Sequence, residues 1–410
     1  MHSLSVLWVS DHPLATSGYA NQTRLAVTRL HRAGLCRIAV LAAYGQVGWT
    51  GELEGVPVFP GGADPFGNDV IAATARRWGA DVVVTLKDVG VYQPERWAQA
   101  VRWAPLAPID HEPPPPGVIE RLRQAWQPIA YAPNGVRAMQ DAGLDPLYAP
   151  HAYDPQVFYP GDKRAARSAL GLPPDAYLVG TVAVNRGGLP SRKAWPQLIE
   201  AVALAARHCP DLHWLCHTDP ADDGFEQGIP LRPLLAQAGL SHRVSLPHAE
   251  QYRAGYTLDH LRLLYQSLDV LLAVSVGEGF GLPTLEAQAC GRPVIVGRWA
   301  AQEDLCAAGW QVERHEATRY LDAQMSYVYL PDPKAVADRI VAAHGTRDPE
   351  RAGALERQAV EGVRMYAIDE VIDRHWRPVI ETMRRRIERE QTHAPGVRQI
   401  IVPKMVLPWR

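Results

Sequence analysis

Two glutamates in a glycine-rich stretch are the residues of this chain best suited to chemistry. Glu278 and Glu286 stand eight residues apart in the run Gly277-Glu278-Gly279-Phe280-Gly281-Leu282-Pro283-Thr284-Leu285-Glu286. Glycine lets the backbone turn sharply and approach a ligand, and Pro283 suits the first position of a helix. A carboxylate accepts hydrogen bonds from two hydroxyl groups, so this pair can bind a sugar or a ribose diol. For Glu286 the alternative is simple compensation of the helix dipole.

A second candidate is a cationic loop before another predicted helix. Arg186, Arg192 and Lys193 flank the turn Gly187-Gly188. Arginine offers a planar fork to phosphate oxygens, lysine adds a point charge, and a helix N-terminus attracts anions. The alternative is a solvated basic loop, and the composition favours anion binding.

A third candidate lies near the start of the chain, in the loop Thr16-Ser17-Gly18-Tyr19. Gly18 enters a predicted helix, where backbone N–H groups can reach a phosphate. A glycine in this place is more often an ordinary turn, so the loop alone is weak evidence.

The elements that must position these residues alternate between strand and helix. Strands are predicted near residues 4–9, 36–43, 81–86, 129–131, 147–148, 178–184, 212–216, 244–246, 269–274 and 294–296. Helices are predicted near residues 20–30, 70–78, 194–207, 231–238, 258–267 and 283–290. This order predicts an α/β protein with parallel sheets and helices on both faces. Ligands bind beyond the carboxyl ends of such strands, where the loops after Val9, Leu86, Ile109, Val184, Cys216 and Val274 lie.

Composition excludes several classes of protein. The 410 residues are 47% hydrophobic and 21% charged, with a net charge of −2, which excludes wholesale disorder and a chain-wide nucleic-acid footprint. The five cysteines include no CxxC pair, so neither a zinc site nor a disulfide framework is indicated. The chain begins without the pattern of a signal peptide and contains no apolar run of about 18 residues. These features predict a cytoplasmic protein.

The stretch from Glu278 to Glu286 resembles the two-glutamate motif of the retaining glycosyltransferases of family four, which have the GT-B fold. Further segments are similar to that family in the same order: Ser17-Gly18-Tyr19, Pro150-His151-Ala152-Tyr153-Asp154 through Phe158, Val184-Asn185-Arg186 with Lys193, Leu264 to Asp269, and Glu286 to Ile295. The resemblance covers about residues 4–345 and is densest in the second half. Two departures are Ala152 in place of a common glycine and a single glycine in the first loop.

The resemblance implies two Rossmann-like, parallel-sheet domains that face each other across a cleft. Residues 1–155 would form the N-terminal domain on the acceptor side, and residues 156–368 the C-terminal domain on the nucleotide-sugar donor side. Residues 369–410 would form a helical tail that packs back on the N-terminal domain.

The resemblance also implies a role for each candidate. The donor diphosphate would be held by Arg186, Lys193, Gly18 and Arg192. Glu286 would bind the ribose. Glu278 would contact the donor sugar, within the donor-sugar loop Gly279, Phe280, Gly281 and Leu282. Asp110 and His111 would lie near the reacting centre as catalytic residues. No metal would be needed, because Arg186 and Lys193 would stabilise the leaving nucleotide, and no cofactor, because the nucleotide sugar is itself a substrate.

The implied activity is retaining transfer of a sugar from a nucleotide sugar to a glycan, a lipid-linked acceptor or a modified nucleobase in DNA. Two alternatives stay open. A nucleotide-sugar epimerase of GT-B architecture would share the donor contacts but would need acid and base groups around the sugar. A non-catalytic nucleotide-sugar binding protein would usually lose charges such as Arg186, Lys193 or Glu278.

The C-terminal segment carries a marked excess of positive charge. Residues 374–410 contain nine Lys or Arg against three Glu, including the triplet Arg384, Arg385 and Arg386. The triplet could bind an anionic surface, either a membrane or DNA. The favoured alternative is a helix packed on the first domain, because an apolar stripe requires burial: Trp376, Val379, Ile380, Met383 and Ile387.

Overall fold

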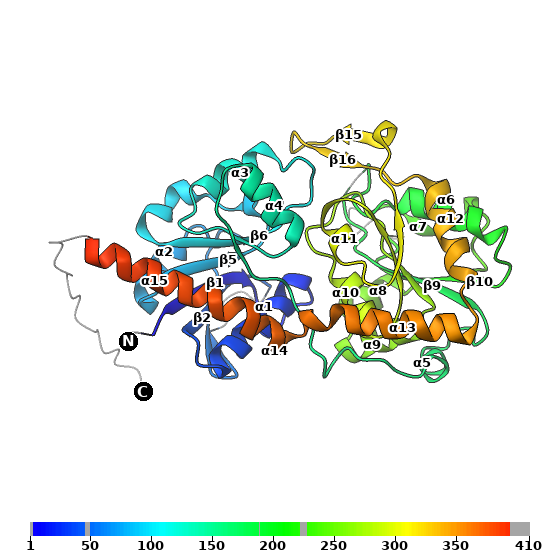
Figure 1. The fold of residues 1–410 in the computed structure, drawn as a ribbon, viewed down its shortest axis with the longest axis horizontal. Helices are drawn as coiled ribbons and strands as arrows, with labels where there is room; N and C mark the ends of the chain where they lie inside the picture. Colours follow the sequence, from blue (N-terminus) through cyan, green and yellow to red (C-terminus); the bar gives the residue numbers. More distant parts are fainter. Residues whose placement is uncertain (1–2, 46–49, 188, 222–227, 394–410) are drawn as a thin grey trace.

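The computed structural model describes residues 3–45, 50–187, 189–221 and 228–393. Two α/β domains lie side by side, and the last long helix crosses back over the first domain (Figure 1). None of the helices in these ranges is both long enough and apolar enough to cross a bilayer. All five cysteines are free thiols, and four of them are buried.

The first domain contains an 8-stranded sheet with the order β3-β4-β2-β1-β5-β6-β7-β8. Its pairs are parallel except for β3 with β4. The strands are β1 (Ser5–Asp11), β2 (Arg37–Tyr44), β3 (Gly51–Leu53), β4 (Val56–Pro60), β5 (Val82–Leu86), β6 (Trp103–Ala107), β7 (Ile129–Ala130) and β8 (Leu147–Tyr148). The helices are α1 (Gly18–Arg32), α2 (Ile71–Trp78), α3 (Pro116–Arg123) and α4 (Pro133–Asp141).

The second domain contains a 6-stranded parallel sheet with the order β11-β10-β9-β12-β13-β14. Its strands are β9 (Tyr177–Val182), β10 (Leu212–His217), β11 (Val244–Ser245), β12 (Val270–Leu272), β13 (Val294–Gly297) and β14 (Gly309–Val312). Its helices are α5 (Lys163–Leu170), α6 (Trp195–Ala206), α7 (Leu231–Gln237), α8 (Ala249–Ala254), α9 (Leu258–Ser267), α10 (Leu282–Ala289), α11 (Ala300–Asp304), α12 (Pro333–His344) and α13 (Pro349–Val363).

An antiparallel hairpin separates the second sheet from α12. It consists of β15 (Arg319–Leu321) and β16 (Tyr327–Tyr329). In Figure 1 it projects from the top of the second domain toward the first. This hairpin was not expected from the sequence, because each of its strands is only three residues long.

Burial explains the central strands. Every residue of β1 and β5 is buried, and both strands are rich in Val and Leu, as strands covered on both faces require. The helix α1 begins where Ser17 accepts a hydrogen bond from the N–H of Ala20 across 3.0 Å. β1 therefore ends, and α1 begins, at the carboxyl edge of the sheet, where the first loop lies.

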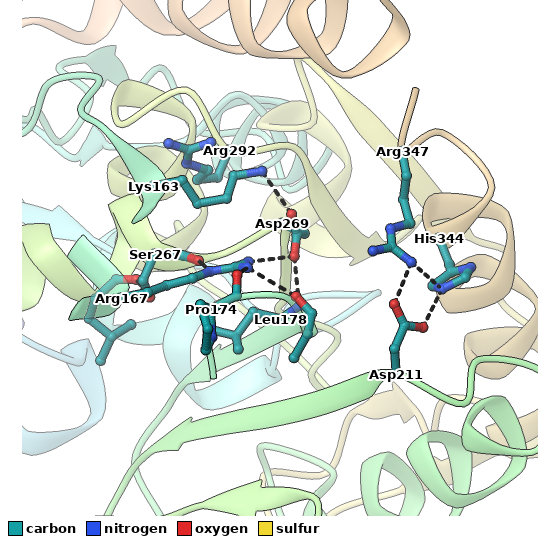
Figure 2. Close-up of polar contacts among 12 residues, drawn as sticks. Lys163, Arg167, Pro174, Leu178, Asp211, Ser267, Asp269, Arg292, His344 and Arg347 are labelled. Carbon is teal, nitrogen blue, oxygen red and sulfur yellow. Dashed lines mark hydrogen bonds and ion pairs between the residues drawn. The ribbon is translucent and has the colours of Figure 1, made fainter. Parts of the chain in front are cut away.

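At the edge of the second sheet where its strands begin, Asp269 connects three elements (Figure 2). Its carboxylate accepts hydrogen bonds from Lys163 and Arg167 of α5, each at 2.7 Å, and from the N–H of Leu178 at 2.7 Å. Burial would raise the pKa of Asp269, but Lys163 and Arg167 lower it. This network joins α5 and β9 to the start of β12.

The chain returns to the first domain through α14 (Ile368–Val371), a π-helical turn (Ile372–Trp376) and α15 (Arg377–His393). Trp376 packs on Trp8 of β1 with ring centroids 5.4 Å apart, and Met383 is fully buried. Arg384 donates to the carbonyl oxygen of Leu35 at 3.2 Å.

The neighbouring arginines of the triplet differ from each other. Arg386 donates to Gln127 Oε1 at 2.9 Å and lies over the ring of Trp126, whereas Arg385 is exposed. Two of the three guanidinium groups, those of Arg384 and Arg386, therefore hold the helix on the first domain. Three further tail cations, Arg398, Lys404 and Arg410, lie outside the described residues.

Candidate active site

The glycine loop of the second domain packs directly on a loop of the first. A β-carbon at Gly277 would lie 2.3 Å from the carbonyl oxygen of Asp110. A β-carbon at Gly279 would lie 2.7 Å from Pro108 Cβ. Glycine is thus required at both positions by the close approach of the two domains, and not only by the turn.

The end of the same loop begins α10. Gly281 has φ of 105°, a conformation that side chains rarely adopt, and it is the residue before the first turn of the helix. A β-carbon at Gly18, the first residue of α1, would lie 3.2 Å from Leu282 Cδ1. The N-termini of α1 and α10 therefore meet at the interface between the domains.

Glu278 forms an ion pair with Lys193, and the two side chains are only 22% and 13% exposed. Burial would raise the pKa of Glu278, but Lys193 and Arg192 lower it. Burial and the neighbouring Arg192 lower the pKa of Lys193. The structure thus brings the carboxylate of Glu278 close to the cations of Arg192 and Lys193, although Lys193 and Glu278 are 85 residues apart in sequence.

Arg192 faces the first domain. Burial would lower its pKa, but the carboxylates of Glu278, Asp110 and Asp88 raise it. The carbonyl oxygen of Arg192 also accepts a hydrogen bond from the N–H of Val276 at 3.0 Å. The cationic loop is therefore joined to the glycine loop through its backbone as well as through its charges.

Arg186 lies in the exposed part of the cationic loop. Its neighbour Asn185 is buried and donates to the carbonyl oxygens of Asp219 and Ile229 at 3.0 and 2.8 Å. This anchoring holds the start of the loop after β9 and leaves Arg186 accessible. Gly188, between Arg186 and Lys193, is outside the described residues.

Glu286 occupies the second turn of α10 and is 9% exposed. The hydroxyl of Tyr265 donates to its Oε2 across 2.8 Å. Burial raises the pKa of Glu286 to about 7, and the Tyr265 hydroxyl opposes that rise. Its protonation state therefore changes near neutral pH.

Asp110 and His111 lie in the loop after β6. His111 Nδ1 is 2.6 Å from Asp110 Oδ1, and His111 Nε2 is 2.9 Å from Asp322 Oδ2 in the hairpin. Burial would raise the pKa of Asp110, but the His111 side chain lowers it. Asp322 was missed in the sequence, because it lies 211 residues from His111 in a short turn.

The side chain of Phe280 packs in the core between the domains. It is 3% exposed, and its ring meets His151 at 5.1 Å, Tyr131 at 6.2 Å and Tyr366 at 5.9 Å between centroids. Burial lowers the pKa of His151 to about 3, so this histidine is neutral. The side chain of Phe280 thus joins the domains, while the loop glycines beside it shape the backbone.

The first domain supplies polar residues that sequence reasoning did not identify. Asp11, at the end of β1, forms an ion pair with Lys87 and accepts from Ser17 Oγ at 2.6 Å. The Tyr19 hydroxyl donates to Asp88 Oδ1 at 3.3 Å. Asp11 ends β1 and Asp88 follows β5. Both residues therefore lie at the carboxyl ends of parallel strands, where ligands bind in such sheets. Within the described residues no group of three or more His, Cys, Asp or Glu is arranged to hold a metal.

Residues 180–343 match the family described as Glycosyl transferases group 1. A D-inositol 3-phosphate glycosyltransferase of Stackebrandtia nassauensis is 32% identical over 217 residues, which is 51% of this chain and 44% of that protein. The D-inositol 3-phosphate glycosyltransferase of Mycolicibacterium gilvum is 37% identical over 143 residues, which is 35% of this chain and 29% of that protein. The chain thus spans less than half the length of these curated relatives.

Solved structures share the fold over almost the whole chain. Sucrose-phosphate synthase from Thermosynechococcus elongatus superposes with a TM-score of 0.70 at 18% identity, covering 95% of this chain and 100% of that chain. HepE of Anabaena, solved in complex with UDP-glucose, gives 0.67 at 15% identity and the same coverage. The two parallel-sheet domains thus share the GT-B fold of these solved structures, and residues 180–343 are similar to the group 1 glycosyl transferases.

Proposed function

We propose that the chain is a retaining glycosyltransferase that transfers a sugar from a nucleotide sugar to a hydroxyl acceptor without a metal ion. The observation that carries the proposal is the junction of Lys193, Arg192 and Glu278 against Asp110 of the facing domain. Two cations that could bind a diphosphate and a carboxylate that could bind a sugar meet there at the domain interface.

The second domain would hold the donor. Arg186, Lys193 and Arg192 would bind the diphosphate, with Gly18 approaching it from α1. Glu286 would accept hydrogen bonds from the ribose hydroxyls. Glu278, with the backbone from Gly279 to Leu282, would contact the sugar. The Lys193–Glu278 ion pair supports this arrangement, because it places a cation and a carboxylate side by side at the domain interface.

Transfer with retention would occur on one face of the sugar. The bond between the anomeric carbon and the phosphate oxygen breaks, the bond between that carbon and the acceptor oxygen forms, and the acceptor proton passes to the leaving phosphate. Arg186, Arg192 and Lys193 would stabilise the charge that develops on the diphosphate. Because these cations do the work often given to a divalent ion, turnover should survive EDTA.

The acceptor would bind on the first domain. The choice among a glycan, a lipid-linked molecule and a modified nucleobase in DNA depends partly on the basic tail. Use of Arg384 and Arg386 in packing favours a tail that holds the fold over one that binds an anionic surface. Binding of the full chain to anionic vesicles or duplex DNA at low salt would reverse that preference.

Incubation with a panel of nucleotide sugars and no acceptor, followed by mass spectrometry and chromatography, tests the proposal. UDP-glucose belongs in the panel, because the structural neighbour HepE was solved with it. Slow release of free sugar and nucleotide supports a transferase. Conversion to an epimeric nucleotide sugar would favour the epimerase alternative, and binding without any turnover would favour the binding protein.

A further inference from the structure

His111 lies between two carboxylates that come from different domains. Its Nδ1 is 2.6 Å from Asp110 Oδ1, and its Nε2 is 2.9 Å from Asp322 Oδ2. The histidine side chain is 5% exposed, whereas the two aspartates are 25% and 24% exposed. His111 is therefore enclosed, and both of its nitrogen atoms are occupied.

The hairpin holds Asp322 in place by contacts of its own. The other carboxylate oxygen of Asp322, Oδ1, accepts from the N–H of Gln324 at 2.8 Å, which leaves Oδ2 for the histidine. Ser326 Oγ donates to the carbonyl oxygen of Pro113, and the N–H of Glu112 donates to the carbonyl oxygen of Tyr327 at 3.3 Å. The turn of the hairpin thus lies along the loop that carries His111.

A second set of contacts fixes the loop that carries His111. Glu112 accepts from the N–H of Ala300 at 2.8 Å and pairs with Arg314 at 2.5 Å. These contacts do not involve His111. The loop and the hairpin would therefore stay close to each other if the Asp322 contact alone were removed.

Two carboxylate acceptors require both ring nitrogens of His111 to be donors, so the ring is an imidazolium. Burial would lower the pKa of His111, but Asp110 and then Asp322 raise it to about 9. The other charged groups around this cluster are Arg192, Asp88, Lys193 and Glu278, which interact with Asp110, and the Glu112–Arg314 pair.

We propose that Asp322 is a positioning residue of the active site: it holds His111 in one orientation and thereby fixes the carboxylate of Asp110 at the domain interface beside Arg192. There the carboxylate can accept a hydrogen bond from a hydroxyl group of the donor sugar or the acceptor. The inference rests on the proposed transferase function. Its structural basis is the chain of contacts from the hairpin through His111 to Asp110, which faces Arg192.

Two substitutions separate charge from position. In Asp322→Asn the side-chain amide can donate to a neutral imidazole, so the contact survives without requiring a charge. In Asp322→Ala the contact is lost. Asp338→Asn, on the exposed surface of α12 with 61% of that side chain accessible, is the matched control.

The readout is the pH profile of nucleotide-sugar hydrolysis without acceptor. The wild type should lose activity as His111 deprotonates near pH 9, because its lone pair would then face the Asp322 carboxylate. Asp322→Asn should stay active and lose this alkaline limb. Asp322→Ala should be slower at every pH, by at least about tenfold, since the carboxylate of Asp110 is misplaced. Asp338→Asn should match the wild type.

NMR titration of the His111 ring provides a test that needs no turnover. The wild type should titrate near pH 9, and Asp322→Asn at least about one pH unit lower. A wild-type value near 6.5, or an alkaline limb that Asp322→Asn leaves unchanged, would overturn the proposal. If the wild type hydrolyses no nucleotide sugar, the proposed function fails, and the titration alone decides whether Asp322 holds His111.

Discussion

The Tyr265 hydroxyl donates to Glu286 Oε2 across 2.8 Å, inside the second domain. Glu286 is thereby oriented before any nucleotide arrives. Burial raises its pKa to about 7, above the ordinary value of 4.5. Because folding favours the protonated form, the stability that Glu286 contributes is fully present below pH 4.5 and is lost as the pH rises through 7.

This relationship predicts a pH dependence of nucleotide affinity. If ionised Glu286 binds the ribose diol, the affinity for UDP should increase by about three- to tenfold between pH 6 and pH 8, as the carboxyl group loses its proton. Calorimetry at both pH values measures it. Glu286→Gln serves as the control, because the phosphates of UDP titrate in both proteins. The account is contradicted if the difference between the proteins does not change with pH.

Tyr265→Phe should move the same transition. The hydroxyl opposes the rise in the pKa of Glu286, so its removal should shift the midpoint of UDP binding to higher pH. Measurement of the dissociation constant from pH 6 to 9 would show the shift. A midpoint that stays in place or moves down would mean that another group governs the transition.

The diphosphate contacts should dominate donor binding. Arg186→Ala should weaken UDP binding by roughly 1.5–3 kcal/mol, the usual effect of losing a hydrogen bond to a charged group. Arg164→Ala is the matched control, because this arginine is 84% exposed on α5, at the opposite edge of the sheet. Equal affinity of the two variants for UDP would mean that Arg186 does not contact the diphosphate.

The two glutamates should differ in their kinetic effects. Glu278→Gln should chiefly lower kcat, because Glu278 acts near the sugar. Glu286→Gln should chiefly raise the donor KM, since ribose contacts are similar in the ground state and the transition state. Steady-state kinetics of nucleotide-sugar hydrolysis without acceptor distinguishes them, and the reverse pattern would exchange their roles.

The first domain should depend on α15 for stability. Met383 is fully buried, so Met383→Ala should cost about 2–5 kcal/mol in the free energy of unfolding. Arg385→Ala on the same helix is the control and should change it by less than about 0.5 kcal/mol, since Arg385 is exposed. Chemical denaturation measures both. Equal stability of the two variants would mean that α15 adds nothing to the domain.

Much of the second domain could be predicted from the sequence, because its motifs are contiguous. The run from Gly277 to Glu286 shows a turn, a helix start and two carboxylates within ten residues. The cationic loop shows its charges in eight residues, from Arg186 to Lys193. Local patterns of this kind reveal a site even when the fold around it is unknown.

The contacts between the domains could not be predicted, because nothing local encodes them. Asp322 lies in the turn of a hairpin whose strands are three residues long, below the length at which alternation is detectable. A strand was expected before the loop after Ile109, but its bounds were not, since the sequence of β6, Trp-Ala-Pro-Leu-Ala, contains a proline that argues against a central strand. The glycines at 277 and 279 suggested a turn, whereas the structure shows that they allow one domain to approach the other.

The central claim is sugar transfer with retention and without a metal, and the stereochemistry of donor hydrolysis tests it most directly. Proton NMR of the wild type with an α-linked nucleotide sugar in EDTA should show the α-sugar first, before mutarotation, and Glu278→Gln should release it more slowly. Initial appearance of the β-anomer, or turnover that EDTA abolishes and magnesium or manganese restores, would contradict the account.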